Sequence, residues 1–154
     1  MLLHSLSLRS NPMILTQMEL QALAQSWGEN LPAGTTILLN GDLGSGKTTF
    51  VQGLGLGLGI SDPIVSPTFT LIQEYFEGRL PLYHFDLYRL SEPEILALHP
   101  ELYWQGEDFP LGLVAIEWPK TLAQVFLIPG PVIELQLTAV DEGQRALAWQ
   151  VIND

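Results

Sequence analysis

The sequence contains no cysteine and only six lysine and arginine residues among 154. The absence of cysteine excludes disulfides and cysteine-ligated metal sites, although it leaves the compartment open. The six basic residues stand against 17 aspartate and glutamate residues, giving a formal net charge of -11. Because nucleic-acid binding requires several basic contacts to phosphates, this balance argues against direct, unaided binding of RNA or DNA. It is compatible with a protein partner that presents a basic face.

Long apolar runs are also missing. None approaches the roughly 18–20 residues that span a bilayer, so we expect no membrane association. Residues 1–8 alternate leucine with serine and lack a basic segment, which is more typical of an edge strand than of a signal peptide. We therefore expect a cytoplasmic protein. Its length predicts a single domain over residues 1–154.

The strongest motif covers residues 41–48, which read Gly-Asp-Leu-Gly-Ser-Gly-Lys-Thr and fit the phosphate-binding pattern Gly-x-x-x-x-Gly-Lys-[Ser/Thr]. An apolar run at 36–39 predicts a buried strand before the motif, and the residues from Thr48 onward can begin a helix. Glycines let successive N–H groups surround phosphate oxygens, and the helix N-terminus adds its dipole. An ordinary glycine turn is the alternative, but the complete match in this context favours nucleotide binding. The residues assigned to the nucleotide are Gly41, Gly44, Ser45, Gly46, Lys47, Thr48 and Thr49.

Within this loop, Lys47 is expected at the β- and γ-phosphates and the Thr48 hydroxyl at Mg²⁺. A second carboxylate for the metal usually stands at the end of a neighbouring apolar strand. Glu117 follows four apolar residues and is the candidate, the alternative being an exposed carboxylate at a strand end. Asp86 ends a second such strand and is the candidate to orient or deprotonate the attacking water. A helix N-cap or a salt bridge to Arg89 is its alternative.

Other polar residues are weaker candidates. Ser66 and Thr68 flank a proline in a loop that could sense the γ-phosphate as a switch segment, the alternative being a hydroxyl-stabilised turn. The three histidines lack metal-ligand spacing and are interpreted as structural. Trp118 is interpreted as packing beside the site, and Arg89 as an ion-pairing residue that could instead stabilise charge.

The remaining pattern predicts a mixture of helices and strands. A capping box of Thr16 and Glu19 predicts a helix after Thr16, and Ser91 with Pro93 predicts another at 92–98. Strand pairs are expected at 70–77 with 80–86 and at 132–139 with 145–152, a further strand at 113–116 and a helix at 121–126, while 99–110 reads as irregular. Glycines at 53, 55, 57 and 59 indicate that the helix after the loop either ends early or packs closely on the sheet. The expected fold is α/β, a three-layer P-loop NTPase-like sandwich on a mixed parallel/antiparallel sheet.

Four blocks in order give a more specific resemblance: residues 41–50, Ser-Pro-Thr-Phe-Thr-Leu at 66–71, His-Phe-Asp-Leu-Tyr-Arg-Leu at 84–90 and Ile-Glu-Trp-Pro at 116–119. Over residues 16–137 the sequence resembles the TsaE (YjeE) family, the ATPase component of bacterial tRNA threonylcarbamoyladenosine biosynthesis. The resemblance implies that Lys47 and Thr48 bind ATP and Mg²⁺, that Glu117 is the second metal-side residue and that Asp86 is required for hydrolysis. It also implies TsaB-like and TsaD-like protein partners, with tRNA reached only indirectly through their complex.

Two other functions remain open. A small-molecule kinase would have the same P-loop, although such kinases usually carry arginines in a lid and this chain has few. A nucleotide-dependent docking module would bind ATP and a partner without turnover. GTP is less favoured than ATP because the sequence has no Asn-Lys-x-Asp motif.

Overall fold

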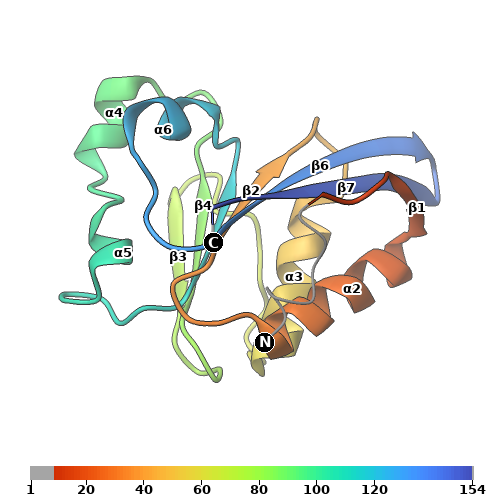
Figure 1. Cartoon of the computed structure of the whole chain (residues 1–154), viewed down its shortest axis with the longest axis horizontal. Helices are drawn as coiled ribbons and strands as arrows, with labels where there is room; N and C mark the ends of the chain where they lie inside the picture. Colours follow the sequence, from red (N-terminus) through yellow and green to blue (C-terminus); the bar gives the residue numbers. More distant parts are fainter. Residues whose placement is uncertain (1–8, 154) are drawn as a thin grey trace.

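The computed structural model describes residues 9–153, so the edge strand expected at 3–8 lies outside the described residues. The fold is α/β, with a seven-stranded sheet in the order β1-β7-β6-β2-β5-β4-β3 (Figure 1). Parallel strands form its centre, and antiparallel strands flank them on both sides, which confirms the mixed sheet. The parallel strands are β6 (Val132–Asp141), β2 (Thr36–Asn40), β5 (Leu113–Glu117) and β4 (Leu82–Asp86). The antiparallel strands are β7 (Gln144–Asn153), β1 (Met13–Thr16) and β3 (Ile72–Tyr75).

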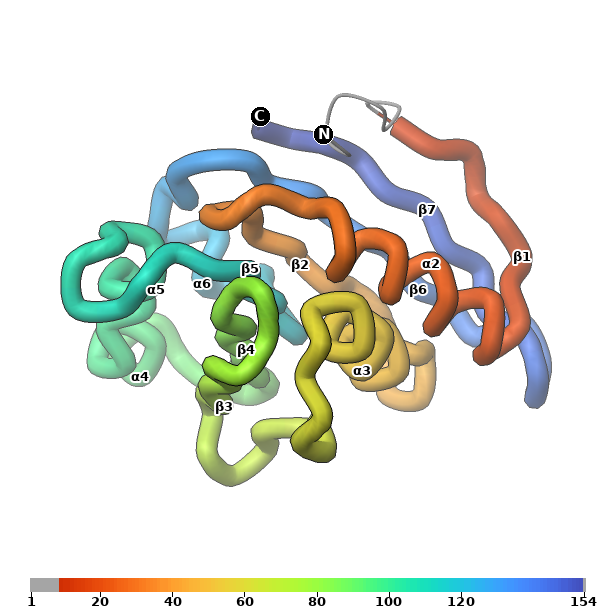
Figure 2. The backbone as a smooth tube through the Cα atoms, turned by 90° about the horizontal axis from the view of Figure 1, so that it is seen from below, coloured from red at the N-terminus to blue at the C-terminus, as the bar shows by residue number. Residues whose placement is uncertain are grey.

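Helices cover both faces of this sheet, as the end-on view in Figure 2 shows. Helices α2 (Gln17–Asn30) and α3 (Lys47–Leu58) lie on one face, and α4 (Glu92–Ala97), α5 (Leu102–Gln105) and α6 (Lys120–Val125) lie on the other. Because alternate strand residues point to opposite faces, the sheet supplies a separate apolar core to each helical layer. Leu39 of β2 packs in the α2–α3 core, whereas its neighbour Leu38 packs in the α4–α6 core. The three-layer prediction is confirmed.

Side-chain caps fix where two of the helices begin. The Thr16 hydroxyl accepts from the Glu19 N–H at 3.1 Å, and the Glu19 carboxylate accepts from the Thr16 N–H at 2.9 Å. Ser91 and Glu94 form the same reciprocal box at the start of α4, with a proline in the first turn. Such caps satisfy N–H groups that a helix leaves unpaired. Both predicted starts are confirmed.

Gly53 and Gly57 of α3 pack against α2, and Gly55 packs against Ile64, so their nearest neighbours are not in the sheet. The helix continues to Leu58 and ends at Gly59, whose left-handed φ of 87° suits a helix C-terminus. A Cβ at Gly53 would lie 2.6 Å from both the Ala24 Cβ and the Gln21 carbonyl oxygen of α2. Both expectations for this helix were therefore wrong. The missing side chains let two helix backbones approach each other closely, and this fixes α3 beneath the loop that precedes it.

Most remaining elements agree with the sequence pattern, although β3, β4 and α4 are shorter than expected and β5, β6 and β7 are longer. The hairpins β3–β4 and β6–β7 and helix α6 are confirmed. Strand β1 and helix α5, each of four residues, were not predicted, and α5 lies in the stretch 99–110 that was expected to be irregular. Within residues 9–153, no helix is both long and apolar enough to cross a bilayer.

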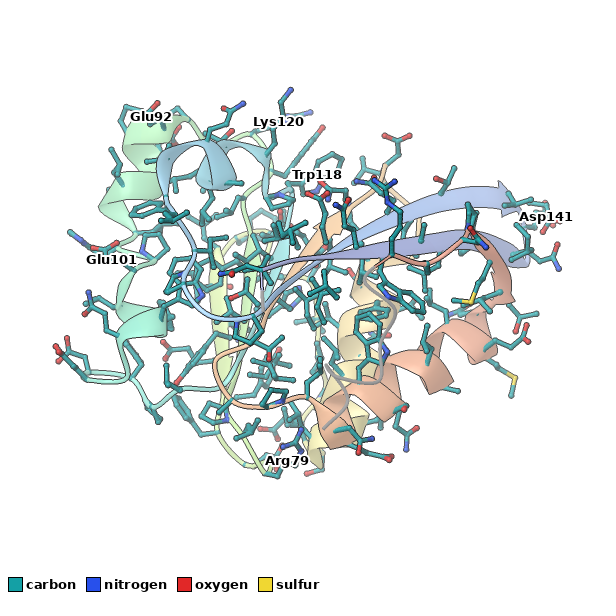
Figure 3. All side chains as sticks on the ribbon, in the orientation of Figure 1. Arg79, Glu92, Glu101, Trp118, Lys120 and Asp141 are labelled. Carbon is teal, nitrogen blue, oxygen red and sulfur yellow. The ribbon has the colours of Figure 1, made fainter. Side chains whose placement is uncertain are left out.

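This topology places several polar segments at one edge of the sheet. The loop after β2 and the ends of β4 and β5 all lie where the parallel strands terminate, since β5 pairs with both β2 and β4. In open α/β sheets, ligands bind in the crevice at the carboxyl ends of the strands. Trp118, directly after β5, lies at this edge in Figure 3, and Arg79 lies at the opposite end.

Candidate functional site

The loop between β2 and α3 forms a concave backbone surface. Its turn is closed by a hydrogen bond from the Ser45 N–H to the Asp42 carbonyl at 3.1 Å. Gly46 adopts φ 107° immediately before α3, and a Cβ there would lie 2.9 Å from the Leu20 side chain. Glycine is therefore required at this position on two grounds, the backbone conformation and the contact with α2. Because Gly46 has no side chain to cap the helix, the first N–H groups of α3 are available to an anion.

Lys47 is held inside this loop. Its side chain is only 5% exposed, and the ammonium donates a hydrogen bond to the Gly41 carbonyl at 2.5 Å. It also lies over the Trp118 ring, 3.5 Å from the centroid. Burial lowers the pKa of Lys47 below its ordinary value, while the nearby carboxylates, chiefly Glu117 and Asp86, act in the opposite direction.

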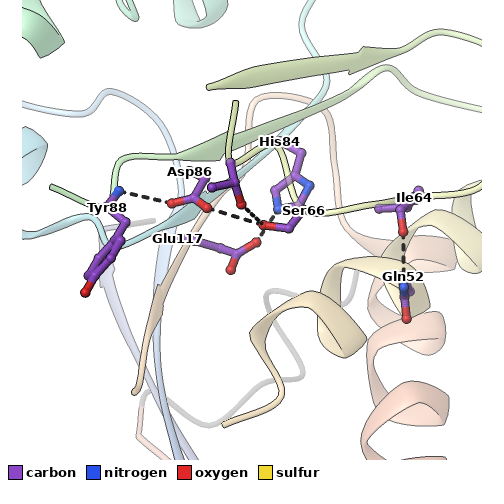
Figure 4. A network of polar contacts seen from close by, with 8 residues as sticks. Gln52, Ile64, Ser66, His84, Asp86, Tyr88 and Glu117 are labelled. Atoms are coloured by element: carbon purple, nitrogen blue, oxygen red, sulfur yellow. Dashed lines mark hydrogen bonds and ion pairs between the residues drawn. The ribbon is translucent and has the colours of Figure 1, made fainter. Parts of the chain in front are cut away.

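Asp86 and Glu117 are the last residues of two adjacent parallel strands and pair in register. Asp86 is 7% exposed and Glu117 3%. The Asp86 carboxylate accepts hydrogen bonds from the Ser66 hydroxyl at 3.3 Å and from the Tyr88 N–H at 3.0 Å (Figure 4). The bond to Tyr88 makes a local turn, since α4 begins only at Glu92. Asp86 is therefore not a helix N-cap.

Arg89 does not form the predicted ion pair. Its guanidinium lies 4.9 Å from the centroid of the Tyr88 ring, and its backbone has φ 65°. The two ion pairs found within residues 9–153 both involve histidines. Neither alternative for Asp86 is therefore observed, and Arg89 lines a neighbouring cavity instead of the one that Asp86 faces.

Glu117 contacts a buried histidine, His84, to which the sequence analysis gave only a structural role. His84, which is fully buried, places its Nε2 atom 2.5 Å from the Glu117 carboxylate. Both residues belong to strand positions that face α3, because Leu82 and Leu113 on the same sides of their strands pack in the α2–α3 core. His84 therefore lies in the row of side chains immediately behind the two carboxylates.

The segment with Ser66 and Thr68 lies against the same carboxylates. The two hydroxyl oxygens are 3.1 Å apart, and Ser66 donates to Asp86. The segment is anchored just beyond them, where the Asp86 N–H donates to the Leu71 carbonyl at 2.9 Å. Leu71 itself adopts φ 68°, an uncommon backbone for a branched side chain. These contacts place both hydroxyls beside the loop that carries Lys47.

One cavity of about 530 Å³ brings most of the predicted site together, and its size is in the range of small-ligand sites. It is lined by Gly44, Gly46, Lys47, Thr48, Thr49, Ser66, Thr68, Asp86 and Glu117. Gly41 and Ser45 face an adjacent cavity of about 620 Å³ on the other side of the loop. The lining also contains residues that sequence reasoning did not assign, namely Gln17, Leu20, Leu43, Tyr88, Trp118 and Arg145.

The residues fit a nucleotide with Mg²⁺. The Ser45 hydroxyl is buried and has no hydrogen-bond partner within the described chain, which is unusual for a buried polar atom. Thr48 and Glu117, which line the cavity, could supply oxygen ligands of the kind that Mg²⁺ prefers. Residues 9–153 contain no group of three or more histidine, aspartate or glutamate side chains that could enclose a metal. Mg²⁺ does not need such a group, because it is usually bound by one or two carboxylates together with substrate phosphates and water.

A family model described as Threonylcarbamoyl adenosine biosynthesis protein TsaE matches residues 14–147. The chain belongs to the TsaE family. Among proteins named tRNA threonylcarbamoyladenosine biosynthesis protein TsaE, that of Synechocystis is 63% identical over 101 residues, which are 66% of this chain and 64% of the relative. That of Nostoc is 58% identical over 118 residues, covering 77% and 71% of the two chains. The match thus spans slightly less than two thirds of the Synechocystis protein.

A more distant TsaE protein and a solved structure agree with this placement. The TsaE protein of Bacillus subtilis is 34% identical over 137 residues, which are 88% of this chain and 82% of the relative. The crystal structure of Bacillus subtilis YdiB superposes with a TM-score of 0.74 at 27% identity, covering 93% of this chain and 87% of YdiB. This chain and YdiB therefore share one fold.

Two further residues that line the cavity of this TsaE chain, Trp118 and Arg145, differ in how far the sequence indicated them. Trp118 was predicted to pack beside the site, and its ring does so, lying against the Lys47 ammonium and the Tyr88 ring. Arg145 comes from β7, and two backbone carbonyls, of Asp141 and Gln144, hold its guanidinium. No local sequence signal marks Arg145, because only the fold of the β6–β7 hairpin brings it beside Gly46.

Proposed function

We propose that this TsaE-family chain binds and hydrolyses ATP with Mg²⁺ in support of threonylcarbamoyladenosine formation in tRNA. The observation that carries the proposal is the pairing of Asp86 and Glu117 in register at the end of two parallel strands. Both carboxylates line one cavity with Lys47 and Thr48. A phosphate-binding loop, a hydroxyl and two carboxylates at one strand edge are the recurring parts of phosphoryl-transfer sites.

The loop residues Gly41, Gly44, Ser45 and Gly46 supply backbone N–H groups and the Ser45 hydroxyl to the phosphates, with Thr49 in the first turn of α3. Lys47 supplies the positive charge. Thr48 and Glu117 hold Mg²⁺, which when bound neutralises charge that develops on the phosphate oxygens.

Asp86 is proposed to orient or deprotonate the water that attacks the γ-phosphate. Its carboxylate is fixed by Ser66 on one oxygen and by the Tyr88 N–H on the other, so it is oriented before any ligand arrives. A preoriented carboxylate contributes mainly to the transition state, not to binding. Ser66 and Thr68 act as the switch segment, because a γ-phosphate beside Asp86 would compete for the Ser66 hydroxyl.

The family and its named relatives support the place of this activity in tRNA modification. We propose TsaB-like and TsaD-like partners, with tRNA bound through their complex, and a cytoplasmic location. A surface with a net charge of -11 suits docking to a basic protein face better than to RNA. Hydrolysis by the isolated chain is expected to be weak and to rise with the partners.

The test is single-turnover ATP hydrolysis by the purified chain, alone and with the two partner proteins, with Mg²⁺ and with EDTA. Phosphate release that requires Mg²⁺ and rises with the partners supports the proposal. ATP that is bound but stays intact in all mixtures would instead identify a docking module. Measuring threonylcarbamoyladenosine in tRNA from cells depleted of the protein, with and without complementation, tests the biological assignment independently.

A further inference from the structure

His84 is a buried polar residue in the centre of a sheet. Its side chain is fully buried, and so are its strand neighbours Tyr83 and Phe85. Its Nδ1 atom has no hydrogen-bond partner within the described chain. Burying an imidazole with one nitrogen unpaired costs free energy that an apolar side chain would not cost. The contact made by the other ring nitrogen, Nε2, must therefore offset the cost of burying His84.

That contact is with Glu117. Nε2 lies 2.5 Å from the carboxylate oxygen Oε2, and Glu117 is itself 3% exposed. A carboxylate that holds Mg²⁺ is ionised and only accepts hydrogen bonds, so in that state Nε2 is the donor of this contact. A hydrogen bond to a charged group at this length is among the stronger ones in proteins. One of the two carboxylate oxygens is therefore committed to the histidine.

The register of the sheet makes the contact specific. His84 pairs with Ala115, and Asp86 pairs with Glu117, so the glutamate reaches back by two residues along the strand toward the histidine. Without this donor, Glu117 would stand beside Asp86 as a second carboxylate in a nearly dry environment, and the two charges would repel each other. The histidine draws Glu117 toward the row behind Asp86.

We infer that His84 is a positioning residue for Glu117 and sets the affinity of the site for Mg²⁺. The inference rests on the proposed function, because it assigns a purpose to the carboxylate that would hold the metal. Groups that orient a metal ligand without touching the metal typically contribute about 10- to 100-fold to metal affinity. His84 acts in that way through one hydrogen bond, without contact with the nucleotide.

The test compares His84→Leu, which removes the donor, with His84→Gln, which retains an N–H donor. ATP binding is measured by calorimetry across a Mg²⁺ titration and again in EDTA. We expect His84→Leu to raise by about 10- to 100-fold the Mg²⁺ concentration at which the Mg²⁺-dependent gain in ATP binding is half-maximal. The affinity for ATP in EDTA should stay within about twofold of wild type. His84→Gln should recover part of the loss. His99→Gln is the matched control, since His99 also pairs with a carboxylate, that of Glu101, but is exposed and outside the cavity.

A double-mutant cycle separates positioning from general damage. In a Glu117→Gln background, His84→Leu should cause no further shift, because residues acting through one contact are not additive. The inference would be overturned if His84→Leu caused the same shift in the Glu117→Gln background as in the wild-type protein. It would also be overturned if His84→Leu caused no shift in the wild-type protein. If His84→Leu does not fold, His84→Asn takes its place, because its amide is too short to reach Glu117. Wild-type protein that binds ATP without any Mg²⁺ dependence would instead contradict the proposed function.

Discussion

The Lys47 ammonium lies over the ring of Trp118, 3.5 Å from the centroid, and donates to the Gly41 carbonyl. Trp118 has φ 58°, so the chain turns sharply after Glu117 and directs the indole over the phosphate-binding loop. A cation over an indole gains about 0.5–2 kcal/mol depending on solvation. These contacts hold the lysine charge within the loop, and a bound phosphate would replace them with stronger charge-assisted hydrogen bonds.

Replacement of this lysine should weaken nucleotide binding. Lys47→Ala removes a charge-assisted contact of about 1.5–3 kcal/mol, so we expect ATP affinity to fall roughly 10- to 150-fold. Calorimetric titration with ATP and Mg²⁺ measures the change. Lys120→Ala is the matched control, because Lys120 is exposed and lies outside the cavity that Lys47 lines. Equal ATP affinity in wild type and Lys47→Ala would show that this loop does not bind the nucleotide.

The two carboxylates should separate kinetically. Asp86→Asn should preserve ATP binding and reduce turnover by about 10²- to 10⁴-fold, because a group that orients or deprotonates water acts in the transition state. Glu117→Ala should instead weaken binding only when Mg²⁺ is present. Both are assayed by equilibrium binding and by single-turnover hydrolysis with partners, with the exposed Asp108→Asn as control. Normal hydrolysis by Asp86→Asn would move the catalytic role to another residue.

The close contact between α2 and α3 predicts that replacing a glycine in α3 by alanine lowers the stability of the protein, the opposite of the usual effect in a helix. In an exposed helix, Gly→Ala stabilises by about 1 kcal/mol. At Gly53 the added Cβ would lie 2.6 Å from the Ala24 Cβ, so Gly53→Ala should destabilise by about 1–3 kcal/mol. Gly143→Ala, where a Cβ meets nothing within 4 Å, should be nearly neutral. Urea unfolding of both variants checks this, and a stabilised Gly53→Ala would show that the two helices separate readily.

The same contact shows what the sequence could and could not predict. The Gly-Leu alternation at 53–59 signalled close packing, but no local pattern identifies the surface against which a helix packs. The shape of the loop was predictable because its seven assigned residues all lie within positions 41–49 and the motif specifies local backbone geometry. Asp86 and Glu117 were predictable because parallel strands end at one edge of a sheet, so two acidic strand ends must lie close together.

The residues that were missed depend on contacts between distant segments. His84 looked structural because a lone histidine in an apolar strand carries no signal until the adjacent strand and its register are known. Arg145 reaches the cavity only because β7 pairs with both β6 and β1. Side chains supplied by a folded-back hairpin have no fixed spacing from a motif about one hundred positions earlier along the chain.

Two buried tyrosines predict a loss of stability at alkaline pH. Burial raises the pKa of Tyr83 to about 12, with the Glu74 charge adding to the effect, and burial likewise raises the pKa of Tyr103. The unfolded tyrosines lose protons near pH 10 while the folded ones keep them, so stability falls as pH rises from about 10 toward 12. Lys47 acts oppositely, because its lowered pKa adds stability as pH rises toward 10.5.

Chemical denaturation from pH 8 to 11.5 should therefore show a declining midpoint above pH 10 that is shallower in Tyr83→Phe. That variant also loses the hydrogen bond from the Tyr83 hydroxyl to the Pro110 carbonyl. It should therefore be less stable than wild type at pH 8, with the difference narrowing as pH rises. Parallel curves for the two proteins would exclude Tyr83 as a source of the alkaline loss.

The isolated chain should not bind tRNA. Of its six basic residues, Lys47 is committed to the loop, the Arg79 guanidinium donates to the Gly28 and Leu31 carbonyls, and Arg145 is held by two further carbonyls. Each phosphate contact on a duplex contributes about 0.9 to the slope of log affinity against log salt concentration. A chain without a basic patch should therefore bind tRNA weakly, and that binding should depend little on salt. We expect a dissociation constant weaker than about 1 µM at physiological salt, in the range of nonspecific binding. Titration of labelled tRNA at two salt concentrations measures it, and submicromolar binding with a steep salt slope would mean that this chain, not its partners, holds the RNA.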